Sequence, residues 1–104
     1  MAAGDRKFGP NGACGEVEGT GAAITVKLDF KPIRVRIFNR TQLAKASWNQ
    51  QMPAASAMLE VTAGTISFIT SAGITGGNNG FIIGTNASLN TDDDTIYWEA
   101  DRSF

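Results

Sequence analysis

The residues with the most chemical potential lie near the end of the sequence, where residues 90–102 read NTDDDTIYWEADR. Three adjacent aspartates, residues 92–94, are of a type that binds calcium or acts in acid–base catalysis. An EF-hand loop beginning at Asn90 would need glycine and glutamate where this sequence has Thr95 and Asp101. Adjacent residues of an extended chain also point in opposite directions, unlike a catalytic carboxylate pair. We therefore interpret residues 92–94 as a solvated turn before a strand.

Other reactive motifs are weak. The sequence has no histidine, the commonest general base and a common zinc ligand. The glycine-rich stretch GITGGNNG lacks the lysine of a P-loop and the GxGxxG order, and Asn79-Gly80 within it is typical of a hairpin turn. We expect no catalytic residue, no metal, no cofactor and no enzymatic activity.

Composition restricts the class of protein. With 104 residues and 42% hydrophobic residues, the chain is long enough for one domain with one modest core. The net charge of −1 provides no field for nucleic acid or acidic membranes, and no apolar run reaches the length of a membrane span. The start of the sequence does not resemble a secretory signal, and the single cysteine, Cys14, fits the cytoplasm, although a link between chains stays open.

From residue 22 onward, the sequence alternates between apolar and polar residues. Ile24, Val26, Leu28 and Phe30 recur with period two, and a second such run follows Pro32. Residues 96–101 alternate in the same way after the aspartates. Six to eight short strands with frequent turns predict an all-β domain over residues 22–104, with the architecture of an antiparallel β-sandwich or jelly roll.

The first 21 residues differ in composition from the rest, because they hold six of the twelve glycines and few apolar residues. Such a segment cannot offset the entropy of ordering through its own contacts. We expect residues 1–21 to be an extended arm that becomes ordered on a partner. The candidate contacts within it are Arg6, Lys7, Phe8 and Val17.

A basic stripe is the third candidate for a binding site. Arg34, Arg36 and Arg40 are separated by even numbers of residues, so a regular strand would place them on the face opposite its apolar residues. This stripe either keeps the sheet soluble, docks on an acidic protein surface or binds nucleic acid, and the acidic net charge disfavours the last. Trp48 and Trp98 are expected in the core, with a sugar-stacking role as the alternative.

The order and spacing of IRVRIFNRT, WNQQMPAASAM, VTAGTISFITSAGIT, GFIIGTNASLN and TIYWEADR resemble small β-sheet decoration (cement) proteins on the capsids of tailed bacteriophages. The resemblance covers about residues 33–102 and rests on turn glycines and aromatic residues. It does not extend over the first 21 residues.

This resemblance implies a non-enzymatic virion protein, made in the host cytoplasm, that binds the outside of the expanded head. Its partner would be the major capsid protein, and it would act as a homo-oligomer, a dimer or a trimer. A protein that binds one lattice state stabilises that state by mass action. The alternative is a ligand- or receptor-binding β module of a tail or head fibre that uses Trp48 or Tyr97 as a stacking surface.

Overall fold

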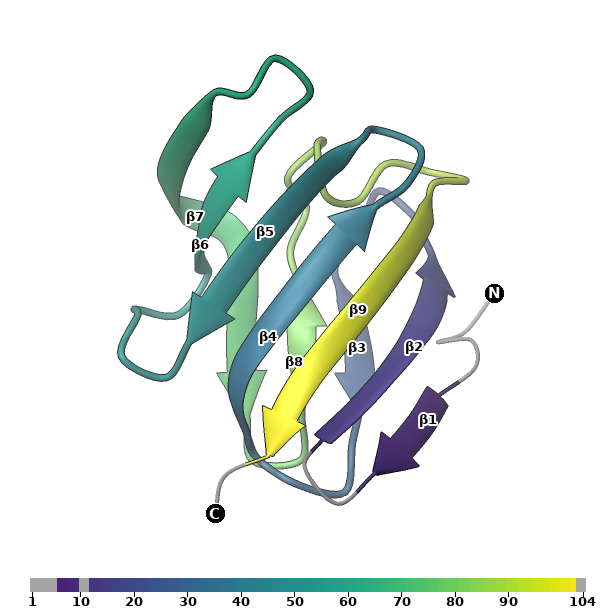
Figure 1. Cartoon of the computed structure of the whole chain (residues 1–104), viewed down its shortest axis with the longest axis vertical. Helices are drawn as coiled ribbons and strands as arrows, with labels where there is room; N and C mark the ends of the chain where they lie inside the picture. The colour runs from purple at the N-terminus through teal and green to yellow at the C-terminus, as the bar shows by residue number, and fades with distance from the viewer. Residues whose placement is uncertain (1–5, 10–11, 103–104) are drawn as a thin grey trace.

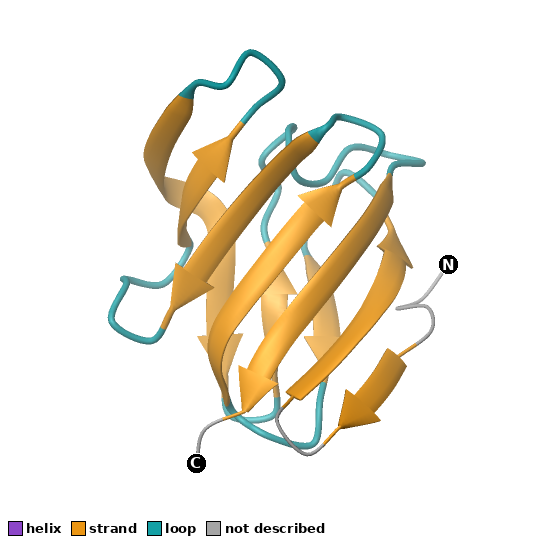
Figure 2. Cartoon of the chain, in the orientation of Figure 1, coloured by secondary structure: helices purple, strands orange, loops and turns teal. Residues whose placement is uncertain are grey.

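The computed structural model describes residues 6–9 and 12–102, and the side chains from residue 12 to residue 102. Within these residues the chain forms nine strands and no helix (Figures 1 and 2). The strands are β1 (Arg6–Gly9), β2 (Gly12–Glu18), β3 (Ile24–Lys27), β4 (Pro32–Asn39), β5 (Ala44–Asn49), β6 (Ser56–Glu60), β7 (Ile66–Gly77), β8 (Gly80–Ile83) and β9 (Thr95–Arg102). They form one sheet of antiparallel pairs in the order β1-β2-β9-β4-β5-β6-β7-β8-β3.

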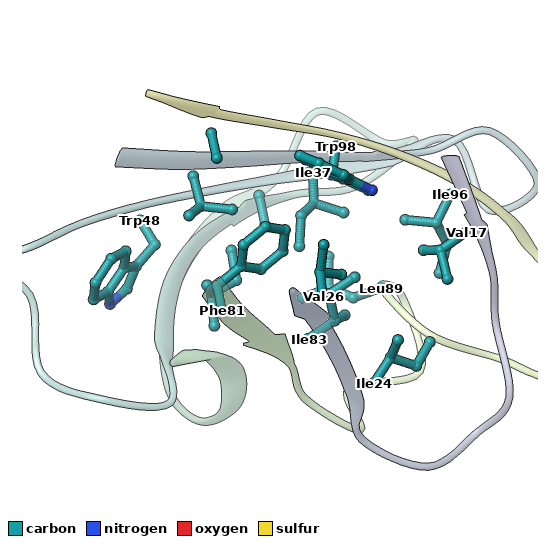
Figure 3. Packing of buried hydrophobic residues seen from close by; sticks show 14 of the residues in the cluster. Val17, Ile24, Val26, Ile37, Trp48, Phe81, Ile83, Leu89, Ile96 and Trp98 are labelled. Carbon is teal, nitrogen blue, oxygen red and sulfur yellow. The ribbon is translucent and has the colours of Figure 1, made fainter. Parts of the chain in front are cut away.

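The sheet curls sharply within β7. The first part of β7 pairs with β6 up to Ala57↔Ile69, whereas Ser56 is already opposite Ile74. The four intervening residues include Ala72, which has a left-handed φ of 59°. This irregularity turns the strand, so that its second part pairs with β8. As a result, β8 and β3 lie behind β4 and β9 (Figures 1 and 3).

The prediction of an all-β antiparallel fold is confirmed. The finer prediction of a β-sandwich or jelly roll is not, because the described strands form one continuous, strongly curled sheet rather than two separate sheets. The predicted hairpin near Asn79-Gly80 joins β7 to β8, with Gly77 opposite Gly80.

The core fills the space inside the curl. Trp98 and Ile37 lie on one side of it, and Phe81, Val26 and Ile83 lie on the other (Figure 3). The rings of Phe81 and Trp98 meet edge to face, with 5.4 Å between centroids and 70° between planes. Trp48 is buried as well, so the prediction that both tryptophans belong to the core is confirmed.

The predicted division between an arm, residues 1–21, and a domain does not match the strand pairing. β2 lies between β1 and β9 and pairs with β9 along its whole length. Val17 is 1% exposed and belongs to the core. The arm prediction is therefore wrong for Gly12–Glu18, because alternation within β2 gives this glycine-rich segment one inward face. The part of the arm prediction that concerns residues 1–5 and 10–11 lies outside the described residues.

The aspartate turn also needs a correction. Asp92 and Asp93 are exposed, but Asp94 is 2% exposed. Its Oδ2 accepts hydrogen bonds from Asn39 Nδ2 at 2.8 Å and Thr91 N at 3.2 Å. Its Oδ1 accepts one from Gln42 Nε2 at 3.3 Å. Asp94 is therefore a buried acceptor that joins the β4–β5 turn to the loop before β9.

Candidate functional site

The candidate site lies on the side of the sheet that faces away from the core, which we call the outer face. Alternation along β4 puts Arg34, Arg36 and Phe38 on this side, because Val35 and Ile37 point inward. The strand register then aligns Arg36 with Glu99 of β9 and Ser47 of β5, and Phe38 with Tyr97 and Lys45. The outer face thus runs across β9, β4, β5, β6 and the first part of β7 (Figure 1).

The charges of this face neutralise one another. Arg34 Nε lies 2.6 Å from Asp101 Oδ2, and Arg36 Nη2 lies 2.8 Å from Glu99 Oε1. The predicted basic stripe on β4 therefore lies beside an acidic stripe on β9. Exposed pairs of this kind add little stability, but they remove the positive field that would attract an acidic partner or nucleic acid.

Two further basic residues lie at the site, Lys45 with an acidic partner and Arg40 with a tyrosine hydroxyl as its partner. Lys45 Nζ lies 3.5 Å from Glu60 Oε1 on the neighbouring strand β6. Arg40, the third predicted arginine, donates from Nη1 to Tyr97 Oη at 3.3 Å. Its guanidinium therefore reaches the edge of an aromatic side chain on the outer face.

Large apolar side chains gather between these charges. The apolar patch consists of Phe38, Met58, Ile66, Phe68 and Tyr97, which are 36% to 62% exposed. An open groove of about 400 Å³ runs through it. Phe38, Tyr97, Met58 and Ile66 border this groove together with Ser47 and the Arg36–Glu99 and Lys45–Glu60 pairs. Phe68 stands outside it, opposite Met58 in the strand register.

The patch exists because the first part of β7 points Ile66 and Phe68 outward, whereas the next apolar residue, Ile69, packs against the core. Ile66 and Phe68 alternate with Ser67, a pattern that would normally turn Ile66 and Phe68 toward a core. The register places Ser67 opposite Leu59, whose side chain is buried, and Phe68 opposite Met58, whose side chain is exposed. A strand with its apolar residues on the solvent side is typical of a face that another molecule covers.

The sequence-predicted site residues divide between the outer face and other places. Arg34, Arg36 and Arg40 are on it. Arg6, Lys7 and Phe8 lie in β1, where their backbones pair with Gly15, Cys14 and Ala13, and their side chains are outside the description. Val17 was predicted to contact a partner, but its side chain is buried in the core and is not available for such a contact.

None of the five residues of the apolar patch was among the predicted contacts for a protein partner. Tyr97 was singled out for sugar stacking, whereas Phe38, Met58, Ile66 and Phe68 were not singled out. The available signal was the excess of apolar residues in residues 58–69, where both sides of the strands carry them. Only the register shows which of these side chains are exposed.

Two further properties bear on the kind of site. Among residues 12–102, whose side chains are described, no group of three or more cysteine, aspartate or glutamate side chains is arranged to hold a metal ion. The described part of the chain also has no helix that is long and apolar enough to cross a membrane.

Comparison with known proteins adds no relative to this description. The chain matches no family model, no characterised protein and no solved structure.

Proposed function

We propose that this chain is a non-enzymatic structural subunit of a bacteriophage particle, which binds the outside of the capsid through the major capsid protein and stabilises the expanded head. The observation that most directly supports a subunit of an assembly, rather than a free monomer, is the apolar patch on the outer face. A free monomer of this size gains nothing from exposing two phenylalanines, an isoleucine and a methionine side by side, whereas a subunit of an assembly covers them. The specific assembly comes from the sequence resemblance to capsid decoration proteins.

The physical logic of such a protein suits a rigid, curled sheet. A ligand that binds the expanded lattice and not its precursor shifts the equilibrium toward the expanded state by its differential affinity. Many small contacts, repeated by the symmetry of the head, then add up without any chemistry at the individual site.

A second candidate function is a ligand- or receptor-binding module of a fibre. One observation favours it: Tyr97 and Phe38 are neighbours in the register and border the groove beside Arg36 and Glu99. Exposed aromatic rings with adjacent polar groups are suited to stacking on a sugar. Trp48 does not support this function, because its indole is in the core.

The test is binding to heads that lack decoration. Purified full-length chain should co-sediment with expanded heads of the phage that encodes it, saturate at a fixed ratio to the capsid protein, and raise the temperature at which the heads open. Unexpanded precursor heads, at the same protein concentration, serve as the control and should bind weakly. Absence of saturable binding to expanded heads would refute the proposal. Binding to an immobilised glycan that Tyr97→Ala abolishes would instead support the fibre module.

A further inference from the structure

The outer face has the features of an interface between two copies of this chain. It carries a projecting side chain, Phe68, which is 51% exposed, directly beside a groove of about 400 Å³. The groove exceeds the volume of a phenyl ring, and aromatic and aliphatic side chains border it. Because projection and groove lie on one face, a two-fold axis between them would put the Phe68 of each copy into the groove of the other.

The charges of the face point to the same partner. The Arg36–Glu99 and Lys45–Glu60 pairs at the groove are satisfied within one chain, at 2.8 Å and 3.5 Å. A partner with a strong net charge would gain nothing from these pairs, whereas a second neutral face neither repels nor requires a counter-charge. A second copy of this face meets that condition, because its own charges are paired in the same way.

The available area is sufficient. A stable interface buries about 800 Å² per partner, which is about one seventh of this chain's surface of 5709 Å². The described chain measures 35 × 30 × 20 Å, so that its broad side is large enough for this contact.

From these observations we infer that the chain forms a two-fold symmetric dimer through its outer face, with Phe68 of each copy seated in the groove bordered by Phe38, Met58, Ile66 and Tyr97 of the other. This inference goes beyond the proposed function and does not depend on it, since no capsid takes part in the contact. If both hold, the dimer is the unit that attaches to the head, and the capsid contact lies on surfaces outside this face.

The experiment is sedimentation equilibrium of the purified full-length chain alone, at several concentrations and at low and high salt. The parent chain should dimerise, with little change between the two salt conditions, because the contact is apolar and its ion pairs are internal. Phe68→Asp should raise the dimer dissociation constant by more than about 30-fold. Ile82→Asp, a matched change at a partly exposed residue on β8, should leave it unchanged.

A second variant separates a specific contact from general stickiness. Ser47 borders the groove, so Ser47→Phe should fill it with the chain's own side chain and weaken the dimer, although it makes the face more apolar. Near-ultraviolet circular dichroism would confirm that each variant keeps the parent fold. A parent chain that is monomeric up to about 1 mM would overturn the inference, as would dimerisation that Phe68→Asp leaves intact or Ser47→Phe strengthens. Because heads are absent, none of these outcomes bears on capsid binding, which is measured separately.

Discussion

Asp94 illustrates how one buried acceptor can hold together parts of the chain that are distant in sequence. It contacts Asn39 and Gln42, more than fifty positions earlier, as well as the nearby backbone of Thr91. Asn39 is buried too, and its Nδ2 also donates to Leu89 O at 3.0 Å. Removing the Asp94 carboxylate would leave three donors short of an acceptor, of which the Asn39 amide is buried and the other two are partly buried.

We predict that Asp94→Ala lowers the free energy of unfolding by about 1–3 kcal/mol, because the buried Asn39 amide and two partly buried donors then lose an acceptor. Asp92→Ala, a matched change two residues away at an exposed position, should change it by less than about 0.5 kcal/mol. Urea unfolding followed by tryptophan fluorescence measures both. Equal effects of the two substitutions would contradict the assignment of Asp94 as the buried member of the cluster.

The sequence alone does not distinguish these three aspartates. Each is equally compatible with a turn, and the local pattern places none of them inside. The burial of Asp94 depends on Asn39 and Leu89, so it is a property of tertiary contacts. By contrast, Trp98 was predictable as a core residue, because alternation with Tyr97 and Glu99 already puts it on one face.

At the scale of elements, two adjacent glycines of β7 differ in how much space a side chain would have. Gly76 faces the core, and a Cβ built on it would lie 2.2 Å from Cη2 of the Trp48 ring. At Gly77, the next residue, the corresponding atom would lie 3.5 Å from the carbonyl oxygen of Gly80, an ordinary contact. The indole of Trp48 is therefore seated directly on the bare backbone of Gly76.

Gly76→Ala should accordingly destabilise the chain by about 1–3 kcal/mol, because the indole must move within a packed core. Gly77→Ala is the matched control and should change the stability by less than about 0.5 kcal/mol. Thermal unfolding gives the stabilities, and a change in tryptophan emission that Gly76→Ala causes and Gly77→Ala does not would report that the Trp48 ring has moved. If both substitutions were neutral, Trp48 would not rest on Gly76 as described.

The limits of sequence reasoning at this scale lie in the register. The positions of β4 and β9 follow from alternation and turn residues, and the structure agrees with them. Alternation does not predict that Ile66 and Phe68 point outward. Their direction is fixed by the register between β6 and β7, which places Phe68 opposite Met58. The apolar patch was missed for this reason, since a shift of one residue in the pairing would exchange the two faces.

At the scale of the whole molecule, the question is where the folded unit begins. β2 contributes Val17 to the core and covers the hydrogen-bonding edge of β9. Just after it, Gly19 N donates to Asp94 O at 2.8 Å, and Thr20 N donates to Asn90 Oδ1 at 2.9 Å. β1 pairs with β2 and stands at the end of the strand order. β1 therefore extends the sheet at its end, whereas β2 contributes to the core.

Two deletions test this order. Removal of residues 1–11 should leave a folded chain whose melting temperature falls by no more than about 8 °C, which corresponds to about 1 kcal/mol. Removal of residues 1–20 should abolish cooperative unfolding. This deletion removes the buried Val17, which contributes roughly 1.5–3 kcal/mol, and the whole pairing of β2 with β9. The total stability of a domain of this size is about 5–15 kcal/mol. Far-ultraviolet circular dichroism and differential scanning calorimetry of both variants give the comparison. A chain without residues 1–20 that still melts cooperatively near the parent temperature would restore this segment to the role of an attachment arm, and β2 would then be a contact that the domain does not need.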